Sequence, residues 1–243
     1  MSLHFFRARE ASVPLLFAAC SGIGLLALGS QANATTLSGN AALTSDYVWR
    51  GTTQTRGDAA VQAGFKLAGD SGFYGSAWGS NVEFAPDTHA SSELDFTIGW
   101  AGALSDKWAL DVNLLRYQYP STTVDLNWTE LNGTLTYDSN YWLSMGYSTE
   151  ALGGEEDGLY TQVGARFPIN DVFRLEGAVG YYLLDGYSAA ADNYLHGQLS
   201  AVWAVNAPLE LRVTAHATDT NAEQIFGKDL AGNRIEAALQ ATF

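Results

Sequence analysis

The last ten residues of the chain, 234–243, alternate strictly between two kinds of side chain. One set is apolar and ends on an aromatic ring: Ile235, Ala237, Leu239, Ala241 and Phe243. The other set is mostly polar: Arg234, Glu236, Ala238, Gln240 and Thr242. Because a two-residue period places successive side chains on opposite faces of a strand, this segment is predicted to be a strand with one apolar face.

The same alternation recurs along the chain, in places less cleanly. The further segments are 36–50, 59–67, 72–82, 92–104, 108–119, 127–137, 141–150, 158–167, 172–183, 193–205 and 209–218. After every second segment the connection is three or four residues long, and the other connections are longer and polar. Short turns at one end and long loops at the other are typical of bacterial outer-membrane barrels. We therefore predict an all-β chain that forms a transmembrane antiparallel up-and-down β-barrel of about 12 strands.

Residues 1–34 have the features of an export signal. Arg7 and Arg9 precede an apolar run, and residues 32–34 form the small-x-small pattern of a cleavage site. We predict that residues 1–34 are a cleaved signal peptide and that residues 35–243 form the barrel in the outer membrane of a Gram-negative bacterium. A lipoprotein site at Cys20 is a weaker alternative, because only about five apolar residues precede it.

The chain is strongly acidic, with 26 acidic and 12 basic residues and a formal net charge of −14. This balance excludes nucleic acid as a partner, because the sequence offers no basic patch to displace counterions from phosphates. Its one cysteine lies in the predicted signal peptide, so the mature protein has no thiol for disulfides or catalysis. After residue 34, no apolar run reaches the roughly 18 residues that a transmembrane helix needs.

Charged residues are expected on the inner face of the barrel, because a charge facing lipid at mid-bilayer costs about 2–4 kcal/mol. The clearest segment is 92–104, in which Leu94, Phe96 and Ile98 are predicted to face lipid. The predicted pore-lining residues are Lys66, Glu93, Asp95, Asp111, Glu130, Arg166, Arg174, Glu176, Glu210, Arg212, Arg234 and Glu236. In segment 108–119 the alternation breaks at Leu115 and Arg116, which predicts a bulge and leaves the facing of Arg116 open.

Aromatic residues of the predicted outer face gather at two depths. Near the short turns they are Trp108, Tyr137, Tyr141, Phe167, Phe173, Trp203 and Phe243. Toward the long loops they are Tyr47, Trp49, Tyr147 and Tyr181. Two belts of amphipathic rings are typical of the lipid interfaces, so outer-membrane lipids are an expected partner.

Short motifs in the first half of the mature chain carry a family resemblance. Residues 45–55 read S-D-Y-V-W-R-G-T-T-Q-T, and further matches lie at 60–62, 72–75 and 93–95. On these residues the chain resembles the proteobacterial TorF family of porin-like proteins. The residues taken as the family motif are Tyr47, Trp49, Arg50, Gly51 and Gln54. The resemblance implies an outer-membrane barrel and a passive channel.

The terminal strand is similar to the assembly signal of outer-membrane barrels. The similarity implies that Ile235, Leu239 and Phe243 close the barrel. It also implies that the barrel-assembly machinery binds this strand.

The predicted lumen favours passive diffusion. A barrel of eight strands is filled by its own side chains, and a barrel of roughly 16 to 18 strands leaves an aqueous channel. A barrel with an intermediate number of strands should therefore leave a narrow or partly plugged path. Small residues on the inner face favour an open one. We expect a porin-like channel for small hydrophilic solutes or ions, with no enzymatic activity, cofactor or metal. A slight excess of acidic residues on the inner wall predicts a mild preference for cations.

Three oppositely charged pairs project into the predicted lumen two residues apart: Arg174 with Glu176, Glu210 with Arg212, and Arg234 with Glu236. They either brace the barrel by neutralising one another or form a transverse field that orients a charged solute.

Two other functions stay open. One is a barrel enzyme that hydrolyses lipids or peptides, which needs a catalytic group at the loop end of the wall. His196 and His216 are the inward-facing candidates there, although an ordinary polar role is the stronger expectation. The other is a closed structural or adhesive barrel.

Overall fold

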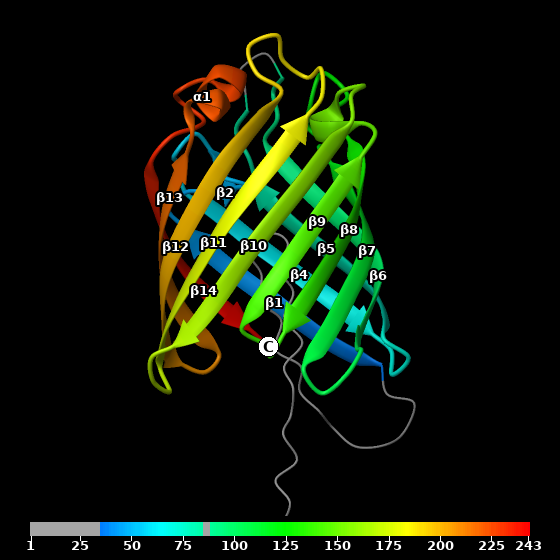
Figure 1. Ribbon diagram of the computed structural model, residues 1–243, viewed down its shortest axis with the longest axis vertical. Helices are drawn as coiled ribbons and strands as arrows, with labels where there is room; N and C mark the ends of the chain where they lie inside the picture. Colours follow the sequence, from blue (N-terminus) through cyan, green and yellow to red (C-terminus); the bar gives the residue numbers. More distant parts are fainter. Residues whose placement is uncertain (1–34, 85–87) are drawn as a thin grey trace, which may run out of the picture.

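The computed structural model describes residues 35–84 and 88–243, so the predicted signal peptide lies outside the described residues. Twelve strands form a closed antiparallel barrel, which confirms the predicted fold (Figure 1). In chain order the wall strands are β1 (Thr36–Thr44), β4 (Ala60–Ala68), β5 (Phe73–Asn81), β6 (Ser92–Ala103), β7 (Trp108–Gln118), β8 (Trp128–Tyr137), β9 (Tyr141–Ser148), β10 (Gly158–Pro168), β11 (Phe173–Leu184), β12 (Asn193–Asn206), β13 (Leu209–Thr218) and β14 (Arg234–Thr242).

The barrel closes where β1 pairs with β14, from Asn40 opposite Thr242 to Thr44 opposite Ala238. The pairing extends past β14, because the Phe243 N–H donates to the Gly39 carbonyl at 2.9 Å. A Cβ added at Gly39 would lie 2.6 Å from Cε2 of Phe243. The absence of a side chain at Gly39 therefore lets the Phe243 ring lie against the seam.

The outer face is mostly apolar on every wall strand. Leu94, Phe96 and Ile98 are 40%, 45% and 67% exposed, whereas Glu93 and Asp95 are 2% and 4% exposed. On β14 the predicted closure residues Ile235 and Leu239 also face outward. A continuous exposed apolar band is foreign to soluble proteins and suits contact with lipid tails.

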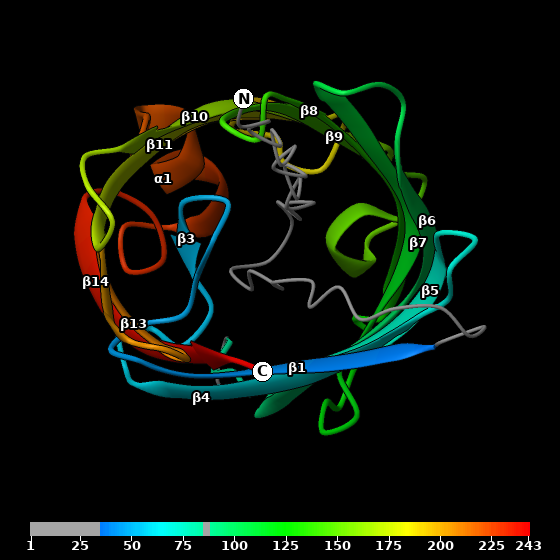
Figure 2. The same cartoon turned by 90° about the horizontal axis from the view of Figure 1, so that it is seen from below.

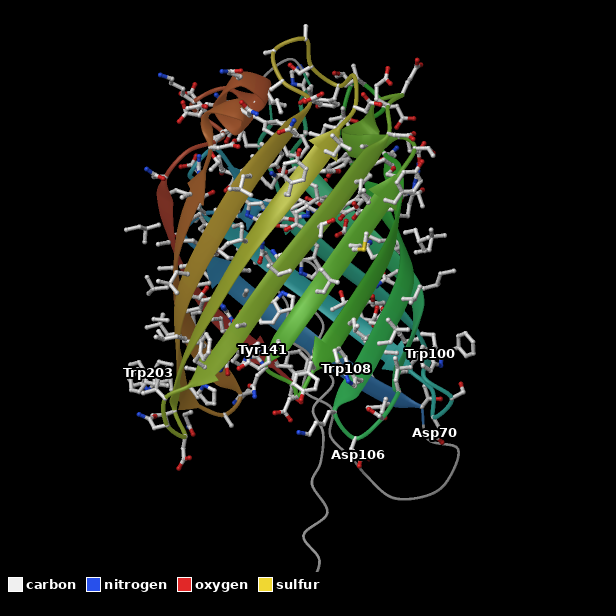
Figure 3. The ribbon with its side chains drawn as sticks, in the orientation of Figure 1. Asp70, Trp100, Asp106, Trp108, Tyr141 and Trp203 are labelled. Carbon is white, nitrogen blue, oxygen red and sulfur yellow. The ribbon has the colours of Figure 1, made fainter. Side chains whose placement is uncertain are left out.

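Aromatic side chains mark one edge of this band. Figure 3 shows Trp100, Trp108, Tyr141 and Trp203 at similar heights around the barrel, above the level of Asp70 and Asp106 in the short turns. Toward the long loops, Tyr147 and Tyr181 are exposed on the outer face. The prediction that Tyr47 and Trp49 join this second belt is wrong, because the chain leaves the wall after Thr44 and both residues lie inside the barrel.

The register of β7 is continuous with both neighbours, so the predicted bulge does not form in this described strand. Leu115 faces inward and is buried, while Arg116 faces outward. Arg116 lies near the loop end, where its Nη1 is 3.1 Å from Oε1 of Glu150 and donates to Thr129 at 2.9 Å. Glu150, which the predicted segment 141–150 included, instead follows β9 in a loop and pairs with this outward guanidinium.

The long connections all lie at one end of the barrel, opposite the short turns (Figure 1). One carries the helix α1 (Thr220–Phe226), and another carries the 3-10 turn η1 (Ala151–Gly153). Among the described residues, no helix has the length and hydropathy needed to cross a membrane.

Candidate functional site

The first long connection, residues 45–59, folds into the barrel and is called the plug below. It contains a hairpin of β2 (Val48–Trp49) and β3 (Thr52–Thr53), and Figure 2 shows β3 inside the ring of wall strands. The predicted first strand continued to Arg50, which is wrong. The φ angles of Arg50 and Gly51 are 47° and 84°, and such positive values reverse an extended chain.

Asp46 ties the plug to the wall. Its carboxylate accepts hydrogen bonds from the hydroxyls of Thr53 and Thr55. It also forms an ion pair with Arg234 of β14 at 3.1 Å. The Tyr47 N–H donates to the Thr55 hydroxyl at 3.0 Å. Because a buried carboxylate must be paired, these contacts hold the base of the hairpin.

Gly51 is the point of closest approach between the plug and the wall. A Cβ added there would lie 2.7 Å from Cβ of His196 and 2.8 Å from Cγ2 of Thr218. Glycine thus serves twice, because the position needs both a positive φ and room for the wall.

Arg50 joins the plug to β8. Its Nη1 and Nη2 donate to the two carboxylate oxygens of Glu130 at 2.8 and 2.7 Å. Its guanidinium carbon lies 4.3 Å from the Trp49 ring centroid and 3.9 Å from that of Tyr160. The side chains of Arg50 and Glu130 are 7% and 1% exposed. A bidentate pair with stacked rings is a geometry that lysine could not reproduce.

Aromatic rings fill the loop half of the lumen around Trp49. Its ring centroid lies 6.1 Å from those of Tyr117 and Trp128 and 6.2 Å from that of Tyr182. Trp49 packs against both buried apolar clusters, one on the β7 and β8 side and one on the β10 to β12 side. This half of the lumen is therefore filled, as a narrow or partly plugged path allows, because the plug supplies rings that the wall pattern does not reveal.

Beneath the plug the lumen contains a cavity of about 170 Å³. Val48, Trp49 and Arg50 border it on the plug, and Ser139 borders it at the turn end. Its other amide and hydroxyl lining groups include Gln62, Asn132, Thr134, Thr136, Ser144, Gln162, Gln198, Ser200, Thr214 and Gln240. Such groups both donate and accept hydrogen bonds, so the cavity suits a hydrated or hydroxylated solute.

Three arginines meet one carboxylate at the turn end of the lumen. Glu176 of β11 accepts from Nε of Arg166 at 2.8 Å, from Nε of Arg174 at 2.7 Å and from Nη1 of Arg212 at 2.8 Å. Arg174 also makes a bidentate pair with Glu210, with both distances 2.7 Å. The network crosses from β10 to β13 and braces the wall.

A second charged group lies on the strands β4 to β7. The Lys66 Nζ is 3.5 Å from the Tyr74 ring centroid, and the Tyr74 hydroxyl donates to Asp111 at 2.9 Å. Closer to the long loops on β6, Glu93 and Asp95 are buried, and the Tyr47 hydroxyl of the plug donates to Glu93 at 3.5 Å. These predicted pore-lining residues face inward but do not border the cavity of the described residues.

Of the three oppositely charged pairs predicted two residues apart, only Arg174 and Glu176 contact each other among the described residues. Glu210 and Arg212 each bind a residue of β11 instead. Arg234 and Glu236 also separate: Arg234 pairs with Asp46, and Glu236 accepts a hydrogen bond from Thr44 at 2.8 Å. Because β12 lies between β11 and β13 in the wall, the ion pairs Arg174–Glu210 and Arg212–Glu176 reach over the inner face of β12.

The two inward histidines are held apart in separate contacts. His196 Nε2 lies 2.9 Å from the Tyr160 hydroxyl, and His216 Nε2 lies 3.0 Å from Glu236. Within residues 35–84 and 88–243, no three His, Cys, Asp or Glu side chains are grouped to hold a metal ion.

Trp142 is a lumen residue that the sequence reasoning missed. Its indole borders the cavity, and its Nε1 donates to Gln162 at 3.0 Å. Gly164 stands opposite it on β10. The sequence did contain a signal for this residue. A tryptophan at an inward position of one strand stands opposite a glycine at an inward position of the next, which leaves room for the indole in the lumen.

A family model described as "Bacterial protein of unknown function (Gcw_chp)" matches residues 29–243. The resemblance to the TorF family stays a prediction, since the matching family carries a different name. A search of curated proteins gives no match.

Solved structures of outer-membrane channels resemble the chain. A KdgM porin in complex with disordered oligogalacturonate has a TM-score of 0.55 and 6% identity, covering 85% of this chain and 98% of that one. The NanC porin has a TM-score of 0.55 and 11% identity, covering 86% and 99%. The COG4313 outer membrane channel of Pseudomonas putida F1 has a TM-score of 0.51 and 8% identity, covering 88% and 96%. At such identities the likeness shows the fold alone.

Proposed function

This chain belongs to Gcw_chp, a bacterial protein family of unknown function, and from that premise we propose that it is a porin-like channel of the outer membrane. Small hydrophilic solutes or ions diffuse through it passively, without catalysis. The cavity under the plug carries this proposal, because polar side chains line it inside a wall whose outer face is apolar. The porin-like architecture of the solved structures supports the same function.

The proposed location follows from the same contrast. An apolar outer face with aromatic rings near the short turns fits a lipid bilayer. The long loops would face outward from the cell and the short turns the periplasm, as in other outer-membrane barrels. Export by the predicted signal peptide and insertion by the barrel-assembly machinery, through the strand β14 and Phe243, belong to the proposal.

We also propose a mild preference for small cations. Among the described residues that face the lumen, eight carboxylates outnumber six cationic side chains, and acidic loops add negative charge at the mouth. Negative potential along a narrow path concentrates cations. The reversal potential in a KCl gradient measures this preference, and a potential of the sign expected for chloride selectivity would contradict it.

Conductance in planar bilayers tests the channel itself. The mature chain is refolded in detergent, and migration on a gel with and without boiling verifies that the barrel has formed. We expect discrete steps of low unitary conductance, because the plug narrows the loop half. Folded barrels that insert without any steps would contradict the channel.

A closed structural barrel is the second candidate, and the plug favours it. Trp49 packs against apolar clusters on both sides of the lumen, which is the packing expected of a permanent filling. The two functions differ in one measurement: a structural barrel would show no ion current until the plug is removed.

A further inference from the structure

The cavity holds cationic groups with unused hydrogen-bond donors. Arg166 and Arg212 both border it, and each gives one nitrogen to Glu176. A guanidinium has five N–H donors. Among the described residues, neither Nη of Arg166 and neither Nε nor Nη2 of Arg212 has a hydrogen-bond partner.

The local charge also leaves room for an anion. Arg166, Arg174 and Arg212 share two carboxylates, Glu176 and Glu210, so the network carries one excess positive charge. The side chains of the two cavity arginines are only 16% and 13% exposed. Low exposure weakens solvent screening and strengthens the attraction of a carboxylate to these guanidiniums.

An aromatic platform lies beside β10, the strand that carries Arg166 two residues beyond Gly164. Trp142 of β9 is opposite Gly164 of β10, and a Cβ added at Gly164 would lie 2.1 Å from Cζ2 of the indole. The indole therefore lies against the bare backbone of the wall, and its hydrogen bond to Gln162 fixes its orientation. The face of a fixed indole attracts the weakly positive C–H groups of a ring-shaped solute.

Groups that suit hydroxyls complete the lining next to the arginines. Gln198 and Gln240 project amides, and the paired hydroxyls of Ser200 and Thr214 lie 2.8 Å apart. These side chains can donate to or accept from a sugar hydroxyl. A cavity of about 170 Å³ holds several water molecules or one small solute of similar volume.

We propose that this part of the lumen is a binding site for a hydroxylated monocarboxylate of about the size of one sugar ring, such as a sugar acid. The carboxylate binds the free donors of Arg166 and Arg212, the ring stacks on Trp142, and the hydroxyls bind the amide and hydroxyl lining. The proposal names the solute class of the proposed channel and so rests on that function. An anion-binding site is compatible with a mild preference for cations. The preference depends on the charges along the whole path, whereas this site depends on one local excess of positive charge.

Equilibrium binding to the folded full-length mature protein in detergent tests the site without requiring conductance. Isothermal titration with glucuronate is compared with glucose, which lacks the carboxylate, and with acetate, which lacks the hydroxyls and the ring. We expect saturable binding of glucuronate at one site and binding at least about tenfold weaker for both comparison solutes.

Three variants locate the site. Arg212→Gln should weaken glucuronate binding by about tenfold or more, and Trp142→Ala should weaken it while the barrel still shows heat-modifiable migration. Arg116→Gln is the matched control, because it removes one guanidinium from the outer face and should leave binding unchanged. Glucose binding as tight as glucuronate, or glucuronate binding that Arg212→Gln leaves intact, would overturn the proposal.

Conductance separates the two proposals. Discrete channel steps together with absent glucuronate binding would refute this site and leave the proposed channel standing. Glucuronate binding without channel steps would support the site and refute passive diffusion.

Discussion

Arg50 is the side chain on which the plug most depends. Its side chain is 7% exposed, pairs with a carboxylate that is 1% exposed, and stacks on the rings of Trp49 and Tyr160. Removal of one partner from a buried pair leaves the other charge without compensation, which costs far more than the pair itself contributes. Substitution of Arg50 should therefore lower the stability of the protein strongly, and the size of the loss should depend on whether Glu130 is still charged.

We expect Arg50→Ala to lower the free energy of unfolding by about 3 kcal/mol, because it leaves the Glu130 carboxylate buried and unpaired. Adding Glu130→Gln should recover part of that loss, since the buried charge is removed. Denaturant unfolding in detergent micelles measures both. Arg116→Gln breaks an ion pair that is more than a third exposed on both sides and should cost roughly 0.5 kcal/mol. Equal losses for the two arginine variants would contradict this assignment.

Two glycines of the plug make a matched pair. Gly51 and Gly57 have φ angles of 84° and 88°, so alanine is strained at either position by about 1–2 kcal/mol. Only a Cβ added at Gly51 would meet the wall, with Cβ of His196 at 2.7 Å, whereas no described atom lies within 4 Å of a Cβ added at Gly57. Gly51→Ala should displace the hairpin and raise the unitary conductance, while Gly57→Ala should leave the conductance unchanged. A similar conductance for the two variants would argue against a close contact between plug and wall at Gly51.

At the scale of elements, the plug is attached at its base and packed at its tip. Wall strands pair with both neighbours around the closed barrel without using β2 or β3. The wall should therefore close without the hairpin, although it would lose the apolar packing around Trp49.

Replacement of residues 48–54 by a short Gly-Ser linker tests this separation. We expect a barrel that still migrates as a folded, heat-modifiable species and conducts several-fold more current, because the rings that fill the loop half are gone. Planar-bilayer recordings of the two proteins give the ratio. A folded variant with unchanged conductance would place the constriction elsewhere, such as at the arginine network.

The strands were predictable from sequence and the plug was not. Along β6 each lipid-facing side chain differs from its neighbours, because the two faces meet opposite environments. Tyr47 and Trp49 continue the parity of Leu43, so the local pattern is the same whether the chain stays in the wall or turns inward. The difference lies in the tertiary contacts of Asp46 and Arg50, which a two-residue period does not encode. The bulge predicted from Leu115 is wrong for the same reason. Leu115 faces inward because the plug gives it apolar neighbours there.

At the scale of the molecule, the outer face determines how the barrel sits in lipid. Ile98 lies in the middle of β6 and is 67% exposed. Ile98→Lys should cost about 2–4 kcal/mol in bilayer refolding, because the ammonium would face the hydrocarbon core. A substitution of Thr97→Lys on the inward side of the same strand should cost less. Equal costs for the two changes would argue against the lipid-facing assignment of Ile98.

The alternation of long and short connections separates the primary amines of the chain. Of its three lysines, Lys228 is exposed among the long loops, Lys107 is exposed in a short turn, and Lys66 lies within the wall. An impermeant acylating reagent added to intact cells should therefore modify Lys228 and spare Lys107, and lysis should make Lys107 reactive. Peptide mass mapping would identify which lysine is acylated in intact cells. Acylation of Lys107 in place of Lys228 would mean that the barrel is inserted in the opposite orientation.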